Sequence, residues 1–457
     1  DPTTSSTIVY ITNQGNSIDI DGIDFENILK KGNGVITDGA GSLNGLYVGN
    51  TNITGVLKGG TIRNVNVKEF HNIDDNENIV FEDTAALYLA GFSSAKIIIE
   101  NVDGYNFGKR LVKAQVSNLM INKIKGESYT NDALSVVNAM DASDIMINNV
   151  QAIGKISVAI ASSCMNTSID NVVFNIDQAN LVSPNSFGIQ IGADNITIKN
   201  VKGKAERHIV FLRIDGKPFR NVSIDGVNVT MPWYGSAVIQ FLQNSEGFDG
   251  LSIENVFVDN ESTFSSNYVS LFDTYYLNVG NKNSKNLTIN NVVLNSKYTM
   301  NDYERIMNLY RITGANIRNI SFENNGVNRA ARGLYIEACN DVRLRDLNIK
   351  AYVHTACQIK DCNDVSMKNI KASASSNYVA TVFNSTRVKF SEVDPTRILL
   401  NDQLSVQNTM YEKCYSMGPS HSRPISPFIN HEHYDTTLGK QIYWNGSIWK
   451  DLMGTPV

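Results

Sequence analysis

Five carboxylate side chains between residues 215 and 337 have the chemistry required for acid–base catalysis. They are Asp215, Asp273, Asp302, Glu304 and Glu337. Hydrolysis of a glycosidic bond uses two carboxyl groups, which lie roughly 5 Å apart in retaining enzymes and roughly 6.5–9.5 Å apart in inverting ones. Neighbouring strands of a sheet are separated by about 4.8 Å. Carboxylates on adjacent or next-but-one strands can therefore meet either requirement.

Aromatic and hydrogen-bonding side chains near these carboxylates are suited to binding a sugar chain, which needs ring faces and polar groups in a shallow groove. The candidates for substrate binding are His208, Arg213, Trp233, Tyr234, Tyr275, Tyr310, Arg311 and Tyr335. An alignment of equivalent short strands predicts one exposed line through Phe211 and Arg213, Gln240, Phe272 and Asp273, Tyr310 and Arg311, and Tyr335 and Glu337. The alternative, in which these rings pack between subunits, stays open.

Elimination at a uronate is the rival chemistry. It needs a base that removes the proton beside the carboxylate and a cation that holds this carboxylate. The segment 204–217, KAERHIVFLRIDGK, carries Glu206, Arg207, His208, Arg213 and Lys217. A third function, in which the same surface binds the sugar without cleaving it, is also open.

A repeated motif must position these residues. It begins with Asn or Asp, alternates apolar and polar residues, and ends on a branched apolar residue, as in SDIMINNV, DNITIKNV and KNLTINNV. The closing apolar residues are Val65, Val102, Ile124, Val150, Val172, Val201, Val227, Val256, Val292, Ile320, Leu347, Ile370 and Val393. Their spacing of 22 to 37 residues indicates a solenoid with loops inserted into some coils.

Each coil is expected to contain two strands. The alternation in the motif has the period of a strand, and a second short run such as FGIQIGA or RGLYIEA precedes most copies. No helical period joins the two runs. The sequence therefore predicts an all-β parallel β-helix of about 13 coils, whose stacking buries one continuous apolar core. The many asparagines are expected to form corners and side-chain ladders.

The composition excludes several classes of protein. Among the 457 residues, 42% are hydrophobic and 19% are charged, which is typical of a folded chain. A net charge of -5 argues against nucleic acid as a partner. No apolar run reaches the ~18 residues of a membrane span. The five cysteines fit no zinc ribbon and predict buried thiols made in a reducing compartment. His431 and His433 lack a partner cluster, so neither a metal nor a cofactor is predicted.

The repeat divides the chain into three regions. Residues 1–60 lack the full motif and are expected to cap the N-terminal end of the solenoid. Residues 61–396 form the solenoid that carries the candidate site. Residues 397–457 are expected to form a small C-terminal β domain with a hairpin turn at Asn445-Gly446. Since a lone hairpin is marginally stable in water, this region should pack on the solenoid or on other subunits.

Two features resemble bacteriophage tailspikes and tail-fibre depolymerases. The repeat ending in NV or NI is shared with pectate lyases and polygalacturonases. The segment 435–451, DTTLGKQIYWNGSIWKD, is similar to a hairpin motif at the ends of many phage tail proteins. The resemblance implies a right-handed parallel β-helix that forms a homotrimer and that binds and cleaves capsular or lipopolysaccharide O-antigen polysaccharide. No catalytic motif of the family is matched, so the resemblance assigns no catalytic residue.

The resemblance also implies a location and partners. The expected location is the virion tail, reached through a region that precedes this sequence, with synthesis in the host cytoplasm and action at the bacterial surface. The expected partners are the polysaccharide and the other subunits, with neither nucleic acid nor membrane. A free bacterial enzyme similar to pectate lyase is the alternative, which the segment 435–451 disfavours.

Overall fold

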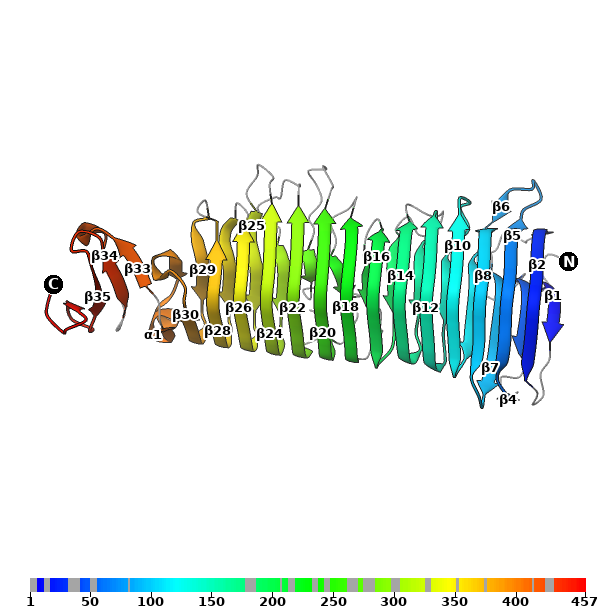
Figure 1. Cartoon of the computed structure of the whole chain (residues 1–457), viewed down its shortest axis with the longest axis horizontal. Coiled ribbons are helices and arrows are strands. Elements are labelled where there is room, and N and C mark those ends of the chain that lie inside the picture. Colours follow the sequence, from blue (N-terminus) through cyan, green and yellow to red (C-terminus); the bar gives the residue numbers. More distant parts are fainter. Residues whose placement is uncertain are drawn as a thin grey trace. The chain divides into compact units, whose positions relative to one another are not determined.

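Strands account for most of the backbone in the computed structural model (Figure 1). The structure describes residues 6–11, 17–31, 42–49, 56–80, 83–176, 186–205, 208–212, 218–231, 237–241, 247–260, 270–273, 284–296, 305–324, 330–350, 353–373, 376–412, 415–423 and 431–457. The chain divides into two compact units, Asp1–Ser245 and Glu246–Val457.

The first unit contains two parallel sheets, whose strands alternate along the chain. The sheet that we call the short-strand sheet contains β1 (Ser6–Ile11), β3 (Leu43–Gly49), β7 (Thr84–Ser93), β9 (Arg110–Val116), β11 (Ser135–Ala139), β13 (Val158–Ser162), β15 (Phe187–Ile191), β17 (Val210–Leu212) and β19 (Ala237–Phe241). The long-strand sheet contains β2 (Ile18–Lys31), β5 (Gly60–Ile73), β8 (Ile97–Phe107), β10 (Leu119–Ser128), β12 (Ser143–Gly154), β14 (Met165–Ile176), β16 (Ile196–Lys204) and β18 (Phe219–Met231). Two short strands, β4 (Val56–Leu57) and β6 (Ile79–Val80), pair with β7 and β5.

The second unit repeats this arrangement. Its short-strand sheet contains β21 (Ser270–Asp273), β23 (Arg305–Tyr310), β25 (Ala330–Glu337), β27 (Val353–Lys360), β29 (Tyr378–Phe383) and β31 (Ile398–Leu400). Its long-strand sheet contains β20 (Phe248–Asn260), β22 (Ser284–Ser296), β24 (Ile312–Asn324), β26 (Asn340–Lys350), β28 (Asn363–Ala372), β30 (Thr386–Ser391) and β32 (Thr409–Glu412).

One short and one long strand make one coil, and consecutive coils stack in parallel. The fold is therefore the all-β parallel β-helix that the sequence predicts. The 13 predicted copies correspond to the long strands from β5 to β30. In the described residues β2 and β32 add a coil before and after them. Residues 1–60, the predicted cap, contribute β1, β2 and β3 to the same sheets. The proposed boundaries at 60 and 396 stay predictions.

The Asn-Val motif has a backbone explanation. The residue before the closing apolar residue adopts the left-handed conformation in coil after coil, with φ 56° at Asn64, 55° at Asn101 and 53° at Asn171. Asparagine tolerates this region better than most residues. The bend turns Val65 and its counterparts into the core, where they are at most 3% exposed. The amides also form the predicted ladders, since Asn101 Nδ2 donates to Asn64 Oδ1 at 3.1 Å.

The C-terminal region of the second unit contains a short helix, α1 (Gln403–Gln407), and a four-stranded sheet of β33 (Tyr415–Gly418), β34 (Glu432–Asp435), β35 (Lys440–Trp444) and β36 (Trp449–Asp451). The predicted hairpin is confirmed, because β35 and β36 are antiparallel around Asn445-Gly446. Asn445 Oδ1 accepts hydrogen bonds from the backbone N–H groups of Ser447 and Ile448. Gly446 adopts φ 99°, which explains why the motif needs glycine there.

The first residue of the segment 435–451 is a buried anion. Asp435 is 0% exposed and accepts hydrogen bonds from Ser420, from Arg423 and from the backbone N–H of Leu438. Burial alone would raise the pKa of Asp435, but these donors lower it to about 2. The carboxylate therefore ties the hairpin to the segment around residue 420 and gives the motif a structural role.

Two expectations from composition can be compared with the structure. Cys164, Cys339, Cys357 and Cys362 are buried free thiols, as predicted, while Cys414 lies outside the described residues. In the described part of the chain, none of the helices has the length and hydropathy of a membrane span.

Candidate functional site

Two rows of side chains point away from the core on the short-strand sheet of the second unit. The first row contains Asn308, Tyr335, Gln358 and Thr381, which pair from strand to strand, and the backbone of Asp273 pairs with Asn308 at its start. The second, which we call the strand-end row, contains Tyr310, Glu337, Lys360 and Phe383. From Asn308 to Thr381 the first row is nearly covered, with Tyr335 only 6% exposed. The strand-end row is half-buried and is therefore the more accessible of the two.

This register corrects the alignment made from the sequence. Asp273 is paired with Asn308, and Glu337 is paired with Tyr310, so Asp273 and Glu337 lie in different rows. Phe272, expected on the exposed line, is 0% exposed and faces the core opposite Met307. The error has a simple cause. A slip of one residue in the alignment exchanges the two faces of a strand, and the alternation in this short segment did not exclude such a slip.

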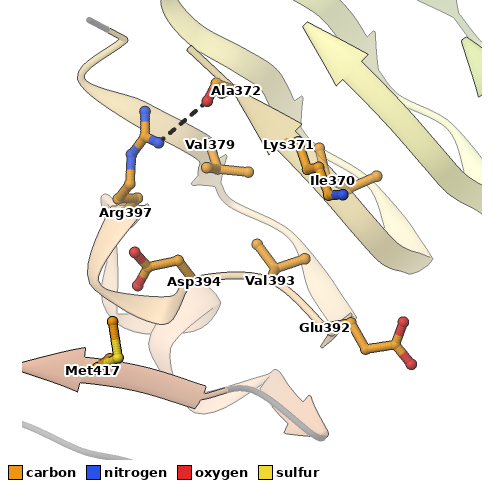
Figure 2. A pocket seen from close by; sticks show the side chains of 9 residues that line it. All are labelled: Ile370, Lys371, Ala372, Val379, Glu392, Val393, Asp394, Arg397 and Met417. Carbon is orange, nitrogen blue, oxygen red and sulfur yellow. Dashed lines mark hydrogen bonds between the residues drawn. The ribbon is translucent and has the colours of Figure 1, made fainter. Parts of the chain in front are cut away.

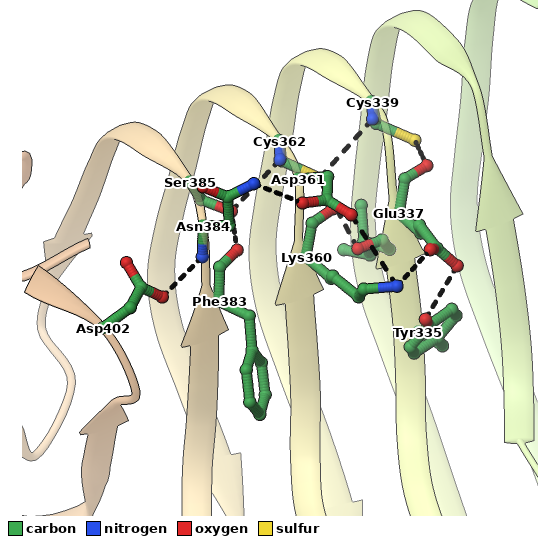
Figure 3. A network of polar contacts seen from close by, with 11 residues as sticks. Tyr335, Glu337, Cys339, Lys360, Asp361, Cys362, Phe383, Asn384, Ser385 and Asp402 are labelled. Atoms are coloured by element: carbon green, nitrogen blue, oxygen red, sulfur yellow. Dashed lines mark hydrogen bonds and ion pairs between the residues drawn. The ribbon is translucent and has the colours of Figure 1, made fainter. Parts of the chain in front are cut away.

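Glu337 lies at the centre of a polar network (Figure 3). Its side chain is 16% exposed. Lys360 Nζ lies 2.6 Å from Oε1, and the Tyr335 hydroxyl donates to Oε2 at 2.7 Å. The hydrogen bond to Glu337 is the largest effect on Lys360 and raises its pKa above the ordinary value. Both oxygens of Glu337 are thus held in place, in a contact set that suits a carboxylate acting as an anion.

Tyr310 and Arg311 flank Glu337 from the preceding coil. The Arg311 guanidinium lies 5.1 Å from the centre of the Tyr310 ring, which is a cation–π geometry. Arg311 adopts φ 52°, and its backbone N–H donates to the Glu337 carbonyl at 3.1 Å. The chain therefore turns at Arg311, directly beyond the strand-end row. A ring, a cation and a carboxylate consequently lie on neighbouring strands.

Asp361 is a second carboxylate close to Glu337, and sequence analysis did not select it or Lys360. Lys360 Nζ lies 3.7 Å from Asp361 Oδ2 as well as 2.6 Å from Glu337 Oε1. The two carboxylate oxygens are therefore at most roughly 6.3 Å apart. This limit is compatible with the separation of about 5 Å between the paired carboxyl groups of retaining glycoside hydrolases. A signal was present, because Cys339 and Cys362 are 23 residues apart and the same step leads from Glu337 to Lys360.

A ladder of thiols and hydroxyls supports the corner behind these residues (Figure 3). The backbone N–H of Cys339 donates to Cys362 Sγ at 3.5 Å, and that of Cys362 donates to Ser385 Oγ at 3.1 Å. The next step runs from Ser385 N–H to Ser405 Oγ at 3.2 Å. Each buried N–H thus receives an acceptor from the following coil, which fixes the turn after the strand-end row.

His208, which was predicted to bind substrate, lies in the first unit and is buried. It is 7% exposed and stacks in a cluster with two aromatic rings, with its centre 5.4 Å from those of Phe187 and Phe211. Phe187 and Phe211 also stack on each other at 5.1 Å. His208 is therefore buried in an aromatic cluster, and this packing accounts for the residue.

Several predicted site residues cannot be placed. Asp215, Asp302, Glu304, Arg213, Trp233, Tyr234 and Tyr275 lie outside the described residues, as do Glu206, Arg207 and Lys217. The backbone of Asp273 is described by its register, but its side chain is not. The described part of the predicted site is thus Tyr310, Arg311, Tyr335 and Glu337, which lie together on β23 and β25 and the turn between β23 and β24.

A cavity of about 430 Å³ lies elsewhere in the second unit (Figure 2). Its lining is Ile370, Lys371, Ala372, Val379, Glu392, Val393, Asp394, Arg397 and Met417. Arg397 donates to the carbonyls of Ser373 and Ser376 at 2.7 and 2.8 Å, and Asp394 accepts from the backbone N–H of Thr396. Arg397 and Asp394 thus bond to backbone groups and hold the chain in place after β30. Neither side chain is arranged for catalysis in this cavity.

His431 and His433 have packing partners in the C-terminal sheet. Their rings lie 5.6 and 5.8 Å from Trp449, which also contacts Trp444 at 5.7 Å. Burial, the largest effect, and the neighbouring His433 lower the pKa of His431 to about 4. Within the described residues, no group of three His, Cys, Asp or Glu side chains is arranged to hold a metal ion.

Similarity to known proteins is found among solved structures. No protein-family model and no curated protein matches the sequence. Tailspike protein 3 of bacteriophage CBA120 is 12% identical, with a TM-score of 0.34, and the match covers 98% of this chain and 65% of that one. A mutant tailspike protein of E. coli bacteriophage HK620, in complex with a pentasaccharide, is 10% identical with a TM-score of 0.44, covering 82% and 72%. The Pseudomonas phage phi297 tailspike is 12% identical with a TM-score of 0.33, covering 77% and 70%.

These three structures are phage tailspikes, the group that the sequence resembles. At 10–12% identity and TM-scores of 0.33–0.44, the likeness assigns no property to this chain. The chain spans about two thirds of the length of the CBA120 protein.

Proposed function

We propose that this chain is part of a phage tailspike that binds a bacterial surface polysaccharide, capsular or O-antigen, and cleaves its glycosidic bonds by hydrolysis. The observation that supports the proposal most strongly is the position of Glu337. This carboxylate is partly accessible, both of its oxygens are held, it contacts the cation of Lys360, and it pairs along the sheet with Tyr310. The Arg311 guanidinium lies over the Tyr310 ring. Aromatic faces beside charged hydrogen-bonding groups are what recognition of a sugar requires.

The roles follow from the contacts. Glu337, paired with Lys360, acts as the anionic partner, the base or nucleophile. The acid is a second carboxyl group on a neighbouring coil, and Asp361 is the described candidate by distance. Asp273 remains a candidate through its register, two coils before β25. Asp215, Asp302 and Glu304 remain candidates from the sequence. Tyr310, Arg311 and Tyr335 bind or orient the sugar.

Elimination is the second candidate, and a specific observation favours it. Lys360 contacts Glu337, and the Arg311 guanidinium lies over the ring of the neighbouring Tyr310. Such cations could hold the carboxylate of a uronate while a base removes the adjacent proton. A polymer without uronate would then be inert. A non-enzymatic receptor-binding fibre would use the same row without cleaving the sugar.

One experiment separates the three functions. The protein is incubated with polysaccharide from the host surface, and viscosity, reducing ends and ultraviolet absorbance are followed. Hydrolysis predicts falling viscosity and new reducing ends without an absorbing product. Elimination predicts the absorbance of an unsaturated uronate. Binding without either change would contradict the enzymatic proposal and support the fibre.

Assembly and location belong to the same proposal. The C-terminal region exposes large apolar side chains, with Met417 at 74%, Leu452 at 70% and Met453 at 89%. Exposed apolar side chains of this kind are suited to contacts between subunits, which supports the expected homotrimer. The segment 435–451 supports a place in the virion tail, acting at the bacterial surface. Cross-linking or light scattering of the purified protein tests the trimer directly.

A further inference from the structure

His71 is a buried histidine that has an acidic group beside each ring nitrogen. It lies near the end of β5 and is 1% exposed. Its Nδ1 is 2.8 Å from Asp132 Oδ2, and its Nε2 is 3.4 Å from Glu69 Oε2. Glu69 lies on β5 as well, whereas Asp132 lies between β10 and β11. Since β8 lies between β5 and β10 in the sheet, the contact joins segments that are two coils apart.

The charges around His71 favour an imidazolium. Asp132 is 2% exposed, and among the described residues neither its Oδ1 nor His71 Nε2 has a hydrogen-bond partner, so that Glu69 faces Nε2 at an ion-pair distance alone. A buried carboxylate in this position needs a positive partner. A neutral ring protonated at Nδ1 would satisfy Asp132, but its Nε2 lone pair would face the carboxylate of Glu69 and be repelled. A ring protonated at both nitrogens is attracted by both carboxylates.

Glu69 is held in place and connects the cluster to solvent. Its Oε1 accepts a hydrogen bond from Asn106 Nδ2 at 2.8 Å, in the next coil. Its backbone adopts φ 52°, a conformation that sets the direction of the side chain. The side chain is 34% exposed, so protons can reach the cluster from water on this side.

The intervening coil fixes the segment that carries Asp132. The carbonyl of Lys109 accepts hydrogen bonds from the backbone N–H groups of Leu134 and Ser135, at 2.8 and 3.0 Å. Other charged groups on the neighbouring strands and turns have partners of their own. Asp83 contacts Arg110 and Lys113, Glu127 contacts Tyr129 and Lys125, and Lys109 also has a partner. Asp132 and Glu69 are thus the carboxylates in contact with the ring.

We propose that Glu69, His71 and Asp132 form a proton-dependent latch that holds the N-terminal coils of the first unit together. The latch does not depend on any activity toward polysaccharide. Burial, the largest effect on the ring, opposes its charge, but the contacts with Asp132 and Glu69 outweigh burial and raise the pKa of His71 above the ordinary value. A raised pKa means that the folded state binds the proton more tightly. The stabilisation is therefore complete below about pH 6.5 and is lost as pH rises through the raised value.

The test compares thermal unfolding of the full chain with that of Glu69→Gln and His71→Gln between about pH 5.5 and about pH 8.5. Glu69→Gln keeps the buried pair of His71 and Asp132 and removes only the charge beside Nε2. We expect the loss in melting temperature for each variant to be at least twice as large at the acidic end as at the alkaline end. His354→Gln, at an exposed histidine, is the matched control and should show no such trend.

Hydrogen exchange locates the effect. At the acidic end, peptides that cover 60–73 and 119–139 should lose protection in Glu69→Gln, while peptides from 330–360 keep theirs. If His71→Gln fails to fold, Glu69→Gln and Asp132→Asn carry the test. A loss that is equal at all pH values would mean a neutral histidine with a packing role, and it would overturn the proposal. So would a wild-type melting curve for Glu69→Gln.

Discussion

Replacement of Glu337 by Gln tests the candidate site with little change of shape. The amide keeps an oxygen that can accept from Tyr335, but it removes the charge that Lys360 contacts at 2.6 Å. We expect the rate of polysaccharide cleavage to fall at least about 100-fold, the usual scale for an acid–base residue. The same fall is expected for Asp273→Asn if Asp273 supplies the second carboxyl group.

The effect on stability should be much smaller than the effect on rate. The Lys360 side chain is 41% exposed, so its ion pair with Glu337 is screened by water and contributes about 1 kcal/mol or less to the free energy of unfolding. The melting temperature and the oligomeric state should therefore stay close to those of the wild type. Loss of activity without loss of stability is the expected signature of Glu337→Gln.

A matched control exists on the long-strand sheet. Lys389 and Glu412 form a pair at 2.7 Å between β30 and β32, with the same residue types as Lys360 and Glu337. Glu412→Gln should keep the wild-type rate. Rates are measured as reducing ends released per enzyme at saturating polysaccharide. Wild-type turnover in Glu337→Gln would refute the assignment, and equal losses in both variants would show that the assay responds to ion pairs in general.

The other predictions concern stability. Asp435→Asn should lower the free energy of unfolding by about 1.5–3 kcal/mol, because it removes the charged acceptor of the hydrogen bonds from Ser420 and Arg423, and urea denaturation measures this loss. The lowered pKa of His431 means that the unfolded state takes up a proton first, so roughly 3 kcal/mol of stability should disappear between about pH 6.5 and pH 4. Tryptophan fluorescence follows this transition, which a His431→Gln variant should flatten. Cys362→Ser should keep an acceptor for the Cys339 N–H, whereas Cys362→Val should cost about 1–3 kcal/mol more in thermal unfolding.

The long-strand sheet could be predicted in detail from the sequence. The closing residues Val65, Val102 and Ile124 pair with one another in the structure as they align in the motif. The reason is physical, because each coil must place a branched apolar residue after a left-handed corner to fill the same core position. The asparagines at these corners meet that requirement, so the sequence motif and the observed strand register agree.

The short-strand sheet was harder to predict, and the candidate site depends on it. Strands such as β21 carry few alternating residues and follow inserted loops, so the sequence did not show that Asp273 aligns with Asn308. The sequence did identify Tyr310 and Glu337, which lie side by side on β23 and β25. It missed Lys360 because the 23-residue step between Cys339 and Cys362 was not extended from Glu337 to the following coil.

Contacts between distant parts of the chain that do not follow the repeat could not be predicted. His71 and Asp132 are 61 residues apart and belong to different copies of the repeat. No motif relates them, since the contact arises from the way two turns meet after folding. Asp435 is an intermediate case. A short motif predicted the hairpin, but the contacts of the buried Asp435 with Ser420 and Arg423 are seen only in the structure.

The most direct test of the proposed function is a crystal structure of the Glu337→Gln variant with an oligosaccharide from the host polysaccharide. The proposed function predicts a sugar ring against Tyr310, with its polar groups within hydrogen-bond distance of Arg311, Lys360 and residue 337. An oligosaccharide bound only in the cavity beside Arg397, or only on the long-strand sheet, would contradict it.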